Sequence, residues 1–367
     1  MEQRLVSINI VSFNGARYLK KCLESVRNQT YKNIEVNILD NDSQDDTLAI
    51  IKEVSKKINL PTTHYKLQTN VGFAKGHNIL ITKSSGAYMV MLNQDAWLDK
   101  NYVAIALEIF NRDATIAALQ PKIYRYNFQT QSVVTKEGKR VLDTTGLVML
   151  KNRRVIARGQ GQVDEGQFEK EEEVFGADGA APIFRRAALE DIKLPIPYSE
   201  RSEKQGSATA GSYTLYPIPS CEYFDEDFFM YKEDVDLSWR LRLYGWKIFY
   251  TPSLIAYHER GSGESASTNY LDIIQERKHI SRLAKSLSWR NQRLMQVKNE
   301  MFWAYVRNLP QILIKEIASF FYILFFEPYA LSSIKEFFAL LPRALKKRFL
   351  IMAHRKITAR QFSQWLQ

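Results

Sequence analysis

The sequence contains little cysteine, and this scarcity limits the kinds of protein it can be. Its 367 residues include two cysteines, Cys22 and Cys221, too few for a disulfide framework and without the paired spacing of a zinc site. We therefore expect the protein to reside in a reducing compartment. A strand-like segment follows Met1 within a few residues, so the sequence predicts no signal peptide.

Long apolar runs and one common nucleotide-binding motif are also missing. The densest apolar run, Ile317–Phe326, spans ten residues and ends at Glu327-Pro328. Because a helix that crosses a bilayer needs ~20 apolar residues, we expect no transmembrane helix. The turn after the first apolar run lacks G-x-G-x-x-G, which argues against a nicotinamide-dependent oxidoreductase.

The composition is that of a large globular chain with a basic tail. Hydrophobic residues make up 45% of the chain and charged residues 25%, which excludes a disordered or collagen-like protein. At ~100–200 residues per domain, the length predicts about two domains. Residues 1–259 contain 33 basic and 33 acidic residues, whereas residues 260–367 contain 18 and 7. The net charge of +11 therefore belongs to the last third.

The beginning of the chain alternates between strand-like and helix-like patterns. Short apolar or β-branched runs predict strands at Val6–Phe13, Ile34–Leu39, His64–Leu67 and Ala87–Leu92. Apolar residues at helical spacing predict helices over residues 18–26, 48–54, 76–81 and 99–110. This alternation is typical of a parallel, doubly wound α/β sheet, whose ligands bind beyond the carboxyl ends of the strands.

Residues 120–225 are less regular, and regular structure resumes at Phe224–Tyr231. We expect a hairpin within Val141–Val155, a helix over residues 236–243 and a short strand at Lys247–Tyr250. The segment Pro195–Ser220 is rich in Pro, Ser, Gly and Tyr, which predicts an exposed insertion. Its position just before an acidic cluster suggests a lid or an acceptor-specific loop.

Polar residues follow the predicted strands at the edge where such sheets bind ligands. Asn93-Gln94-Asp95 follows the fourth strand. A carboxylate there suits a divalent cation that bridges a diphosphate, and a simple turn is the alternative. Asp40 ends the second strand, where it can bind a base or a ribose. A helix capping box, with Ser43 as the N-cap and Asp46 three residues later, explains Ser43, Asp45 and Asp46 but not Asp40.

Further segments also carry candidate chemistry. Asn70–Asn78 holds two glycines before a helix, which suits either an anion at the helix N-terminus or a tight turn. Asp225–Asp236 holds six carboxylates in twelve residues. Glu233 and Asp234 begin a helix, so they either interact with its dipole or supply a general base. His258 follows a short strand and is either structural or a metal ligand.

Taken in order, these segments resemble the family 2 glycosyltransferases, and most closely their rhamnosyltransferase-like branch. The resemblance covers roughly residues 5–310. The matching motifs are VSFNG (11–15), LDNDSQD (39–45), NVGFAKGHN (70–78), LNQDAWL (92–98), FGADGAAPIFRR (175–186), FDEDFFMYKEDVDLSWRLRLYGWKIFYTP (224–252), YHERGSG (257–263) and VKNEMFWAYVRNLP (297–310).

The resemblance implies a GT-A fold, which is an α/β fold with a doubly wound, Rossmann-like mixed sheet. The catalytic domain would span residues 1–265, with a nucleotide-sugar half over about 1–120 and an acceptor half over about 121–265. A helical, amphipathic extension would follow over residues 266–367.

The resemblance also implies a role for each matching residue. Asp234 corresponds to the catalytic base, with Glu233 beside it, whereas Asp95 and His258 correspond to ligands of Mg²⁺ or Mn²⁺. The implied donor-binding residues are Val11, Ser12, Asp40, Asn41, Gly72, Phe73, Asn78, Asn93 and Gln94.

The sequence departs from the family pattern at two of these places. Asn93 stands where the family often has Asp, so a cation would be held more weakly and would depend on the donor diphosphate. Lys298-Asn299 stands where the branch commonly has Arg-Asn, which weakens the case for a specific phosphate contact there.

The implied activity is inverting, metal-dependent transfer of a sugar, rhamnose or another deoxysugar, in the synthesis of a cell-surface polysaccharide. The donor would be a dTDP- or UDP-sugar, and the acceptor a saccharide or a lipid-linked saccharide. The alternative is a catalytically impaired nucleotide-sugar-binding or scaffolding protein of the same fold, because a carboxylate is missing at Asn93.

The basic tail predicts attachment to a membrane surface. Between Ile334 and Phe349, apolar residues alternate at helical spacing with Lys335, Arg343, Lys346, Lys347 and Arg348. An interfacial helix has this composition, with its cations facing anionic headgroups. We therefore expect a cytoplasmic protein, peripheral on the inner face of the cell membrane, and no nucleic-acid partner. The alternative is a tail that packs on the protein or on a second subunit.

Overall fold

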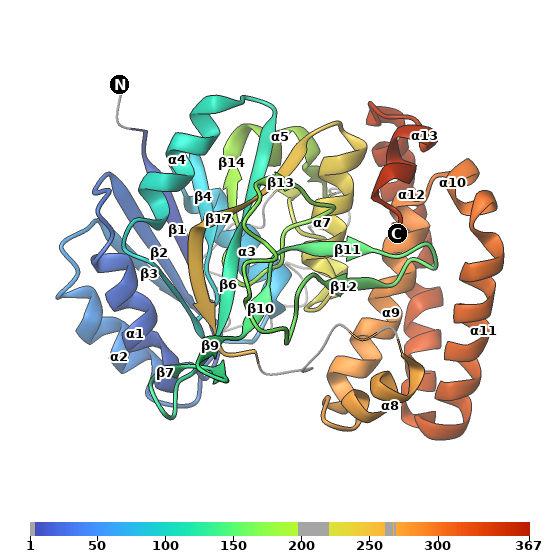
Figure 1. Cartoon of the computed structure of the whole chain (residues 1–367), viewed down its shortest axis with the longest axis horizontal. Helices are drawn as coiled ribbons and strands as arrows, with labels where there is room; N and C mark the ends of the chain where they lie inside the picture. The colour runs from blue at the N-terminus through green and yellow to red at the C-terminus, as the bar shows by residue number, and fades with distance from the viewer. Residues whose placement is uncertain (1–3, 197–219, 261–266, 268) are drawn as a thin grey trace, which may run out of the picture.

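The computed structural model describes residues 4–196, 220–260, 267 and 269–367, and the chain begins with a wound α/β unit (Figure 1). The first strands are β1 Val6–Ser12, β2 Ile34–Asp40, β3 Thr62–Lys66 and β4 Tyr88–Met91. The helices that alternate with them are α1 Ala16–Arg27, α2 Thr47–Ser55, α3 Gly72–Lys83 and α4 Tyr102–Arg112. Each predicted element of this region is confirmed, although α3 begins at Gly72 and not at residue 76.

The strands that follow are shorter and more varied, apart from two long ones. They are β5 Ala96–Leu98, β6 Ile116–Asn127, β7 Ser132–Val133, β8 Thr135–Lys136, β9 Lys139–Arg140, β10 Leu142–Thr144, β11 Leu147–Met149, β12 Val155–Ala157, β13 Glu172–Glu173, β14 Ile183–Arg185, β15 Leu194–Pro195, β16 Cys221–Glu222 and β17 Lys247–His258. Helices α5 Arg186–Ile192 and α7 Glu233–Leu243 lie among them. The predicted hairpin is present as β11 and β12, and it extends beyond Val155.

One mixed sheet joins the two halves of this region in the order β13-β17-β6-β14-β4-β1-β2-β3. β1 pairs in parallel with both β2 and β4, and Ser12 lies opposite Asp40 in the register. This pairing brings the carboxyl ends of the strands to one edge, where wound sheets bind ligands. β14 runs antiparallel between β4 and β6, which makes the sheet mixed, as the resemblance implied.

β17 is longer than the strand predicted at Lys247–Tyr250. It continues past Pro252 to His258, and its register against β6 shifts between Thr251 and Ile255. Proline has no N–H for the ladder, so an irregularity at Pro252 lets the strand resume beyond it. The extension matters for the site because it pairs His258 with Ala96 of β5.

The segment Pro195–Ser220 was expected to be an exposed insertion. β15 and β16 pair at its base, with Leu194 opposite Glu222 and Pro195 opposite Cys221. Residues 197–219 lie outside the described residues, so the predicted lid or acceptor loop stays a prediction.

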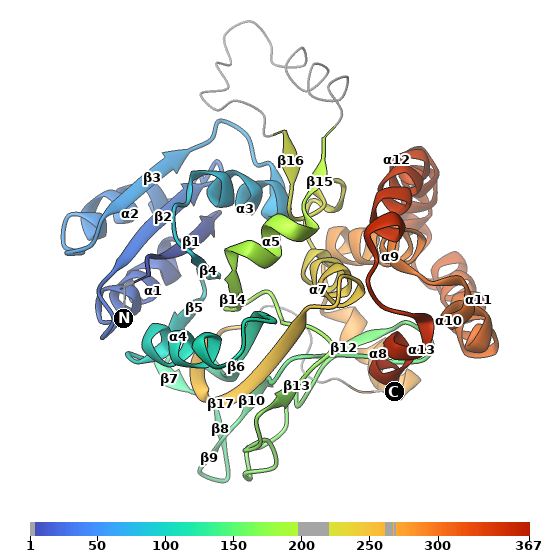
Figure 2. The same cartoon turned by 90° about the horizontal axis from the view of Figure 1, so that it is seen from above.

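The C-terminal third is helical, as expected, and it packs against the α/β unit (Figure 2). Its helices are α8 Tyr270–Lys278, α9 Arg282–Asn299, α10 Phe302–Arg307, α11 Leu309–Phe326, α12 Ser332–His354 and α13 Ala359–Phe362. Phe362 is fully buried and stacks on Trp239 of α7, with ring centroids 5.5 Å apart. The tail therefore completes the hydrophobic core under α7. The domain boundary at residues 265 and 266 stays a prediction.

Buried ion pairs fix the tail to the acidic cluster that precedes and enters α7. Lys298 of α9 pairs with Asp225 and, at 2.9 Å, with Asp236. Lys347 of α12 lies 2.5 Å from Asp225 and 2.5 Å from Glu222. Several carboxylates of the cluster are thus structural, because each neutralises a cation that the tail buries.

These contacts correct the expected placement of the basic residues of α12. Lys347 is buried, Arg343 pairs with Asp227 at 2.9 Å, and Arg348 donates hydrogen bonds to the backbone carbonyls of Val297 and Glu300. These three cations face the protein, which is the alternative arrangement that the sequence allowed. Lys335 and Lys346 are exposed.

α11 is longer than the apolar run that suggested no transmembrane helix. In the part of the chain that the structure describes, α11 is long and apolar enough to cross a membrane, with 18 residues of which 11% are buried. The expectation underestimated its length because Lys315-Glu316 interrupts the apolar run near the middle of the helix. Core helices of soluble proteins meet the same criterion of length and composition.

We predict that Lys347→Met lowers the free energy of unfolding by about 3 kcal/mol, because the substitution leaves buried carboxylates without their cation. Lys346→Met changes the neighbouring exposed lysine and serves as the matched control. Chemical denaturation of both variants measures the difference. Equal stability of the two variants would show that the ion pairs of Lys347 do not hold the tail in place.

Candidate active site

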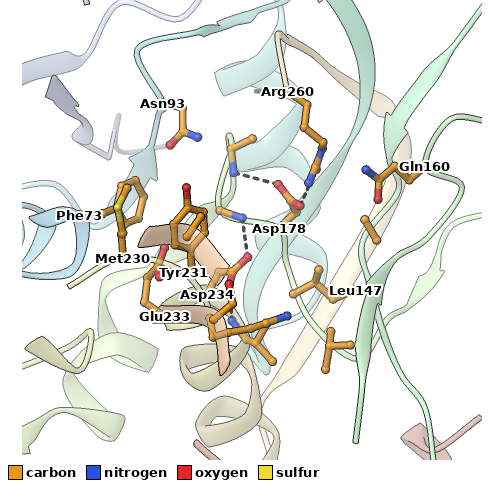
Figure 3. A pocket seen from close by; sticks show the side chains of 18 of the residues that line it. Phe73, Asn93, Leu147, Gln160, Asp178, Met230, Tyr231, Glu233, Asp234 and Arg260 are labelled. Atoms are coloured by element: carbon orange, nitrogen blue, oxygen red, sulfur yellow. Dashed lines mark hydrogen bonds and ion pairs between the residues drawn. The ribbon is translucent and has the colours of Figure 1, made fainter. Parts of the chain in front are cut away.

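A pocket of about 650 Å³ lies between the sheet edge and the N-terminus of α7 (Figure 3). Six of the predicted site residues line it, namely Phe73, Asn93, Asp95, Glu233, Asp234 and His258. The other seven are Val11, Ser12, Asp40, Asn41, Gly72, Asn78 and Gln94, which do not line this pocket. The pocket therefore unites the proposed metal ligands with the proposed base.

Asp95 and His258 face each other on one side of this pocket. The antiparallel pairing of β5 with β17 sets His258 opposite Ala96, which places its Nε2 atom 3.4 Å from Asp95 Oδ1. On the other side of the ring, His258 Nδ1 lies 2.9 Å from Asp143 Oδ2. Burial disfavours a charged imidazole, but the carboxylates of Asp95 and Asp143 outweigh it and raise the pKa of His258 to about 10.

This arrangement fits a divalent cation with few protein ligands. A carboxylate oxygen and an imidazole nitrogen converge, and Asp143 is placed as the outer carboxylate that commonly orients a metal-bound histidine. No group of three or more His, Cys, Asp or Glu side chains suited to a metal is found among the described residues. Further ligands would therefore come from a bound diphosphate and water, as is usual for Mg²⁺.

Glu233 and Asp234 lie together at the first turn of α7. Asp234 Oδ1 accepts a hydrogen bond from its neighbour Val235 N at 2.7 Å, and Oδ2 accepts one from Gly179 N at 3.2 Å. Burial and the charge of Asp178 raise the pKa of Asp234 to about 6. Burial and the charge of Asp234 raise the pKa of Glu233 to about 8. At neutral pH, Asp234 is the carboxylate of the pair that can accept a proton.

The sequence analysis missed three residues of the site, the buried Asp143 and Asp178 and the partly buried Arg260. Arg260 donates hydrogen bonds to Asp143 at 2.6 Å and to Asp178 at 2.9 Å (Figure 3 shows the contact with Asp178). Through Arg260 the histidine side of the pocket is connected to the side that holds Asp234. Asp178 and Arg260 lie inside the quoted motifs, so their position was a usable signal, whereas Asp143 of β10 lies outside every motif.

Asp40 lies at the end of β2 with one oxygen available for a ligand. It is fully buried, and its Oδ1 atom accepts a hydrogen bond from Ser43 N at 3.0 Å. Its Oδ2 atom is buried and has no hydrogen-bond partner among the described residues. Because a buried polar atom is normally paired, this oxygen fits a donor such as a base N–H.

The capping box proposed for Ser43 and Asp46 is wrong. Asp46 occupies the N-cap of α2 without a side-chain capping bond, and the Ser43 hydroxyl accepts a hydrogen bond from Asn14 N at 2.9 Å. Ser43 therefore holds the end of β1 to the end of β2. Asp45 instead binds the first residue of α2, because its Oδ1 atom accepts a hydrogen bond from Thr47 N at 3.0 Å.

Hydrogen bonds between turns shape the remaining donor-side residues. Gln94 Oε1 accepts from Ser12 Oγ at 2.7 Å, which connects the end of β1 to the end of β4. Asn41 Oδ1 accepts from Val71 N at 2.9 Å and so holds the turn before α3. Val11 lies under α3, close to Gly76. These residues are placed to support a donor pocket, and their contact with a donor stays a prediction.

Gly72 and Asn78 have structural contacts in α3. Gly72 adopts φ +83°, and a Cβ atom there would lie 2.5 Å from Phe229, so glycine is required at this close approach. Asn78 is fully buried, and its amide bonds to the backbone of Tyr223 and Phe224. Both residues attach α3 to the segment that leads into α7, and their predicted contact with the donor is untested.

Solved structures identify the class of fold. Residues 1–349 of S. aureus TarS match with a TM-score of 0.52 at 15% identity, covering 95% of this chain and 88% of that one. GalNAc-T7, crystallised with UDP, GalNAc and Mn²⁺, matches with a TM-score of 0.52 at 14% identity, covering 80% and 51%. Such low identities show the fold alone, and that fold is GT-A.

Residues 7–193, just over half of the chain, match Glycosyl transferase family 2, and the chain belongs to this family. Chondroitin synthase from Escherichia coli is 35% identical over 115 residues, which is 31% of this chain and 16% of that protein. The Methanococcus voltae protein named dolichyl N-acetyl-α-D-glucosaminyl phosphate 3-β-D-2,3-diacetamido-2,3-dideoxy-β-D-glucuronosyltransferase is 32% identical over 124 residues, 32% of this chain and 36% of that one. The chain thus spans well under two thirds of these relatives' length.

Proposed function

We propose that the protein is an inverting glycosyltransferase that moves a sugar from a nucleotide-diphosphate donor to an acceptor hydroxyl. The observation that carries this proposal is one pocket whose lining includes Asp95 and His258 as well as Asp234. Neighbours of the same fold were crystallised with UDP or UDP-GlcNAc, which supports a nucleotide-sugar donor. The dTDP- or UDP-sugar inferred from the motifs is part of the proposal.

The donor would lie across the carboxyl ends of β1, β2 and β4. Asp40 Oδ2, which has no partner among the described residues, would accept a hydrogen bond from the base. The diphosphate would lie beside the cation at Asp95, and the buried Oδ1 atom of Asn93, an acceptor without a partner among the described residues, would accept a hydrogen bond from a hydroxyl of the donor. The sugar would then reach the pocket between Asp95 and Asp234, with Phe73 on its wall.

Asp95 and His258 would hold Mg²⁺ or Mn²⁺ together with the donor diphosphate. The cation would neutralise charge that develops on the leaving diphosphate. Asp143 would accept a hydrogen bond from His258 Nδ1–H and leave Nε2 free to bind the metal, because a ligating imidazole must be neutral there. Arg260 would offset the charge that Asp143 and Asp178 then retain.

Asp234 is the residue we assign as the base. Its carboxylate would accept the proton of the acceptor hydroxyl as the acceptor oxygen bonds to the anomeric carbon. The bond from that carbon to the diphosphate oxygen breaks on the opposite side, so the configuration inverts. Glu233, with its higher pKa of about 8, would stay protonated at neutral pH and help to keep Asp234 the ionised partner.

The sugar and the acceptor are proposed from the motifs. The rhamnosyltransferase-like pattern favours rhamnose or another deoxysugar, and a saccharide or lipid-linked saccharide of the cell surface as the acceptor. An impaired nucleotide-sugar-binding protein is the second candidate, because Asn93 replaces a carboxylate beside Asp95. Thermal shift against a panel of dTDP- and UDP-sugars would find the donor, and hydrolysis of that donor with Mn²⁺ would exclude the impaired protein.

We also propose that the enzyme is cytoplasmic and binds peripherally to the inner face of the cell membrane. Both cysteines are free, which suits the cytoplasm. Large apolar side chains of α10 and α11 are exposed, among them Trp303 at 71% and Phe325 at 69%. Exposed apolar patches of this kind mark interaction surfaces, and exposed cations such as Arg307 and Lys335 suit anionic headgroups.

For the base, we expect Asp234→Asn to lower kcat by about 100-fold or more while donor affinity is retained. Glu233→Gln should cause a smaller loss, because Glu233 is protonated at neutral pH. In the unchanged enzyme, kcat/KM should rise as pH increases through about 6, because the Asp234 carboxyl must first lose its proton. Full transfer by Asp234→Asn would refute the assignment.

For the metal, thorough chelation should abolish transfer, and added Mn²⁺ should restore it. Asp95→Asn should need a higher Mn²⁺ concentration for half-maximal donor binding in calorimetry, since a charged ligand is lost. Asp46→Asn is the matched control, because Asp46 is exposed and lies outside the pocket. Activity that survives chelation unchanged would contradict the role of Asp95.

For the membrane, we expect the chain to sediment with anionic liposomes and the double variant Trp303→Glu/Phe325→Glu to stay in the supernatant. Two carboxylates on the exposed apolar surface would oppose insertion at an anionic interface. The double variant Gln129→Glu/Thr130→Glu adds the same charge on an exposed turn and should still sediment. Equal release of both variants would indicate a charge effect without a specific surface.

A further inference from the structure

A second groove, of about 530 Å³, lies beside the catalytic pocket between helices α8, α9 and α11. Its walls are mainly apolar, with Ile273 and Ile274 from α8, Trp289 from α9, and Tyr322 and Ile323 from α11. The groove is thus built wholly from the tail helices apart from its inner end.

The inner end of the groove is continuous with the catalytic pocket. The two cavities share five lining residues, namely Arg154, Val155, Lys232, Ile280 and Ser288. Lys232 is the N-cap of α7 and directly precedes Glu233 and Asp234. A molecule that passes from the pocket into the groove must therefore pass Lys232, close to the proposed base.

Basic side chains gather at this junction. Arg154, Lys232, Arg293 and Lys315 all line the groove, and Glu316 pairs with both Arg293 and Lys315. Among the described residues, no carboxylate lies within ion-pair distance of the Lys232 ammonium. Burial lowers the pKa of Lys315. The positive charges of Arg293 and Lys232 also lower it, whereas the carboxylate of Glu316 raises it. Cations that repel one another in a partly buried site favour a bound anion.

Helix α11, which forms one wall of the groove, also carries an exposed apolar surface. Ile314, Ile317 and Phe321 of this helix are 64%, 55% and 50% exposed. These side chains do not line the groove. Helix α11 therefore has one apolar face toward the groove and a second apolar face toward the solvent. The catalytic pocket thus continues, past the shared Arg154 and Lys232, into a groove whose lining is mainly apolar and also includes Glu276 and Arg277.

We propose that this groove binds the apolar chain of an amphiphilic acceptor, and that a phosphate or diphosphate between chain and sugar contacts Lys232, Arg293 and Lys315. The proposal rests on the proposed function and specifies its acceptor as lipid-linked. The sequence of environments matches the sequence of groups in such a molecule: sugar, anion, hydrocarbon. Each methylene group buried in the groove adds to the affinity, so an amphiphile with a chain binds more tightly than a free saccharide.

The test uses the full chain and isothermal titration calorimetry with three probes. Dodecyl phosphate carries both the anion and the chain, inorganic phosphate carries the anion alone, and dodecyl maltoside carries the chain with a neutral head. Below their micelle concentrations, we expect dodecyl phosphate to bind at least about tenfold more tightly than either of the others.

Two substitutions block the groove from opposite walls, each with a neighbouring control. Ala318→Trp on α11 should weaken dodecyl phosphate binding about tenfold or more, whereas Ile317→Trp, outside the lining, should not. Ile274→Glu on α8 should have the same effect through charge, and Gln275→Glu, exposed and outside the lining, should not. Because both walls are tested, failure of one variant to fold leaves the other to decide.

Lys232→Met tests the junction. It should weaken dodecyl phosphate and leave dodecyl maltoside unchanged, because only the anionic head would contact the lysine. Equal binding of dodecyl phosphate and inorganic phosphate would overturn the channel, and equal binding of dodecyl phosphate and dodecyl maltoside would overturn the anion site. Equal weakening by Ile317→Trp and Ala318→Trp would move the binding to the outer surface of α11 and so refute the groove.

Donor binding separates this proposal from the proposed function. The Ala318→Trp and Ile274→Glu variants should bind the nucleotide donor as the unchanged chain does, since neither residue lines the catalytic pocket. Intact donor hydrolysis without dodecyl phosphate binding would refute the groove alone. If the chain binds dodecyl phosphate but no nucleotide-sugar, the proposed glycosyltransferase function is refuted and the proposed amphiphile site stands.

Discussion

The buried ion pairs between α7 and the tail helices determine how the rest of the molecule is arranged. Asp225 and Asp236 lie on either side of Glu233 and Asp234 in the sequence, and Lys298 contacts both of the outer pair. The proposed base is thus held on a segment whose two ends are fixed by one lysine from α9. Because removal of a single partner from a buried pair is costly, the position of Asp234 depends on residues far along the chain.

The carboxylates of the acidic cluster accordingly have two roles, one in the catalytic pocket and one in holding the tail. Two carboxylates, those of Glu233 and Asp234, face the catalytic pocket, and others neutralise Lys298, Arg240 and Lys347. Burial raises the pKa values of Glu233 and Asp234, whereas Lys298 and Lys347 outweigh burial and lower the pKa of Asp225. Within one short segment, some carboxylates are therefore buried without a paired cation among the described residues, and others are paired with a buried cation.

The sequence predicted the wound α/β region well because local patterns determine it. Apolar runs and helical spacing placed β1 to β4 and α1 to α4, and the order of motifs predicted the fold class and six residues of the pocket. The contacts that escaped prediction are long-range ones. Asp143 meets His258 across 115 residues, and Lys347 meets Asp225 across 122. No local pattern records such pairs, so the basic tail was interpreted as surface charge.

The packing of Phe362 on Trp239 has a consequence for how the chain is made. Synthesis proceeds from the N-terminus, so the wound sheet can form while the tail is still on the ribosome. The core under α7 cannot close until α12 and α13 have been added, because Ile351 and Phe362 complete it. The base would therefore gain its final surroundings only late in synthesis. A shortened nascent chain would present a formed donor edge beside an incomplete catalytic wall.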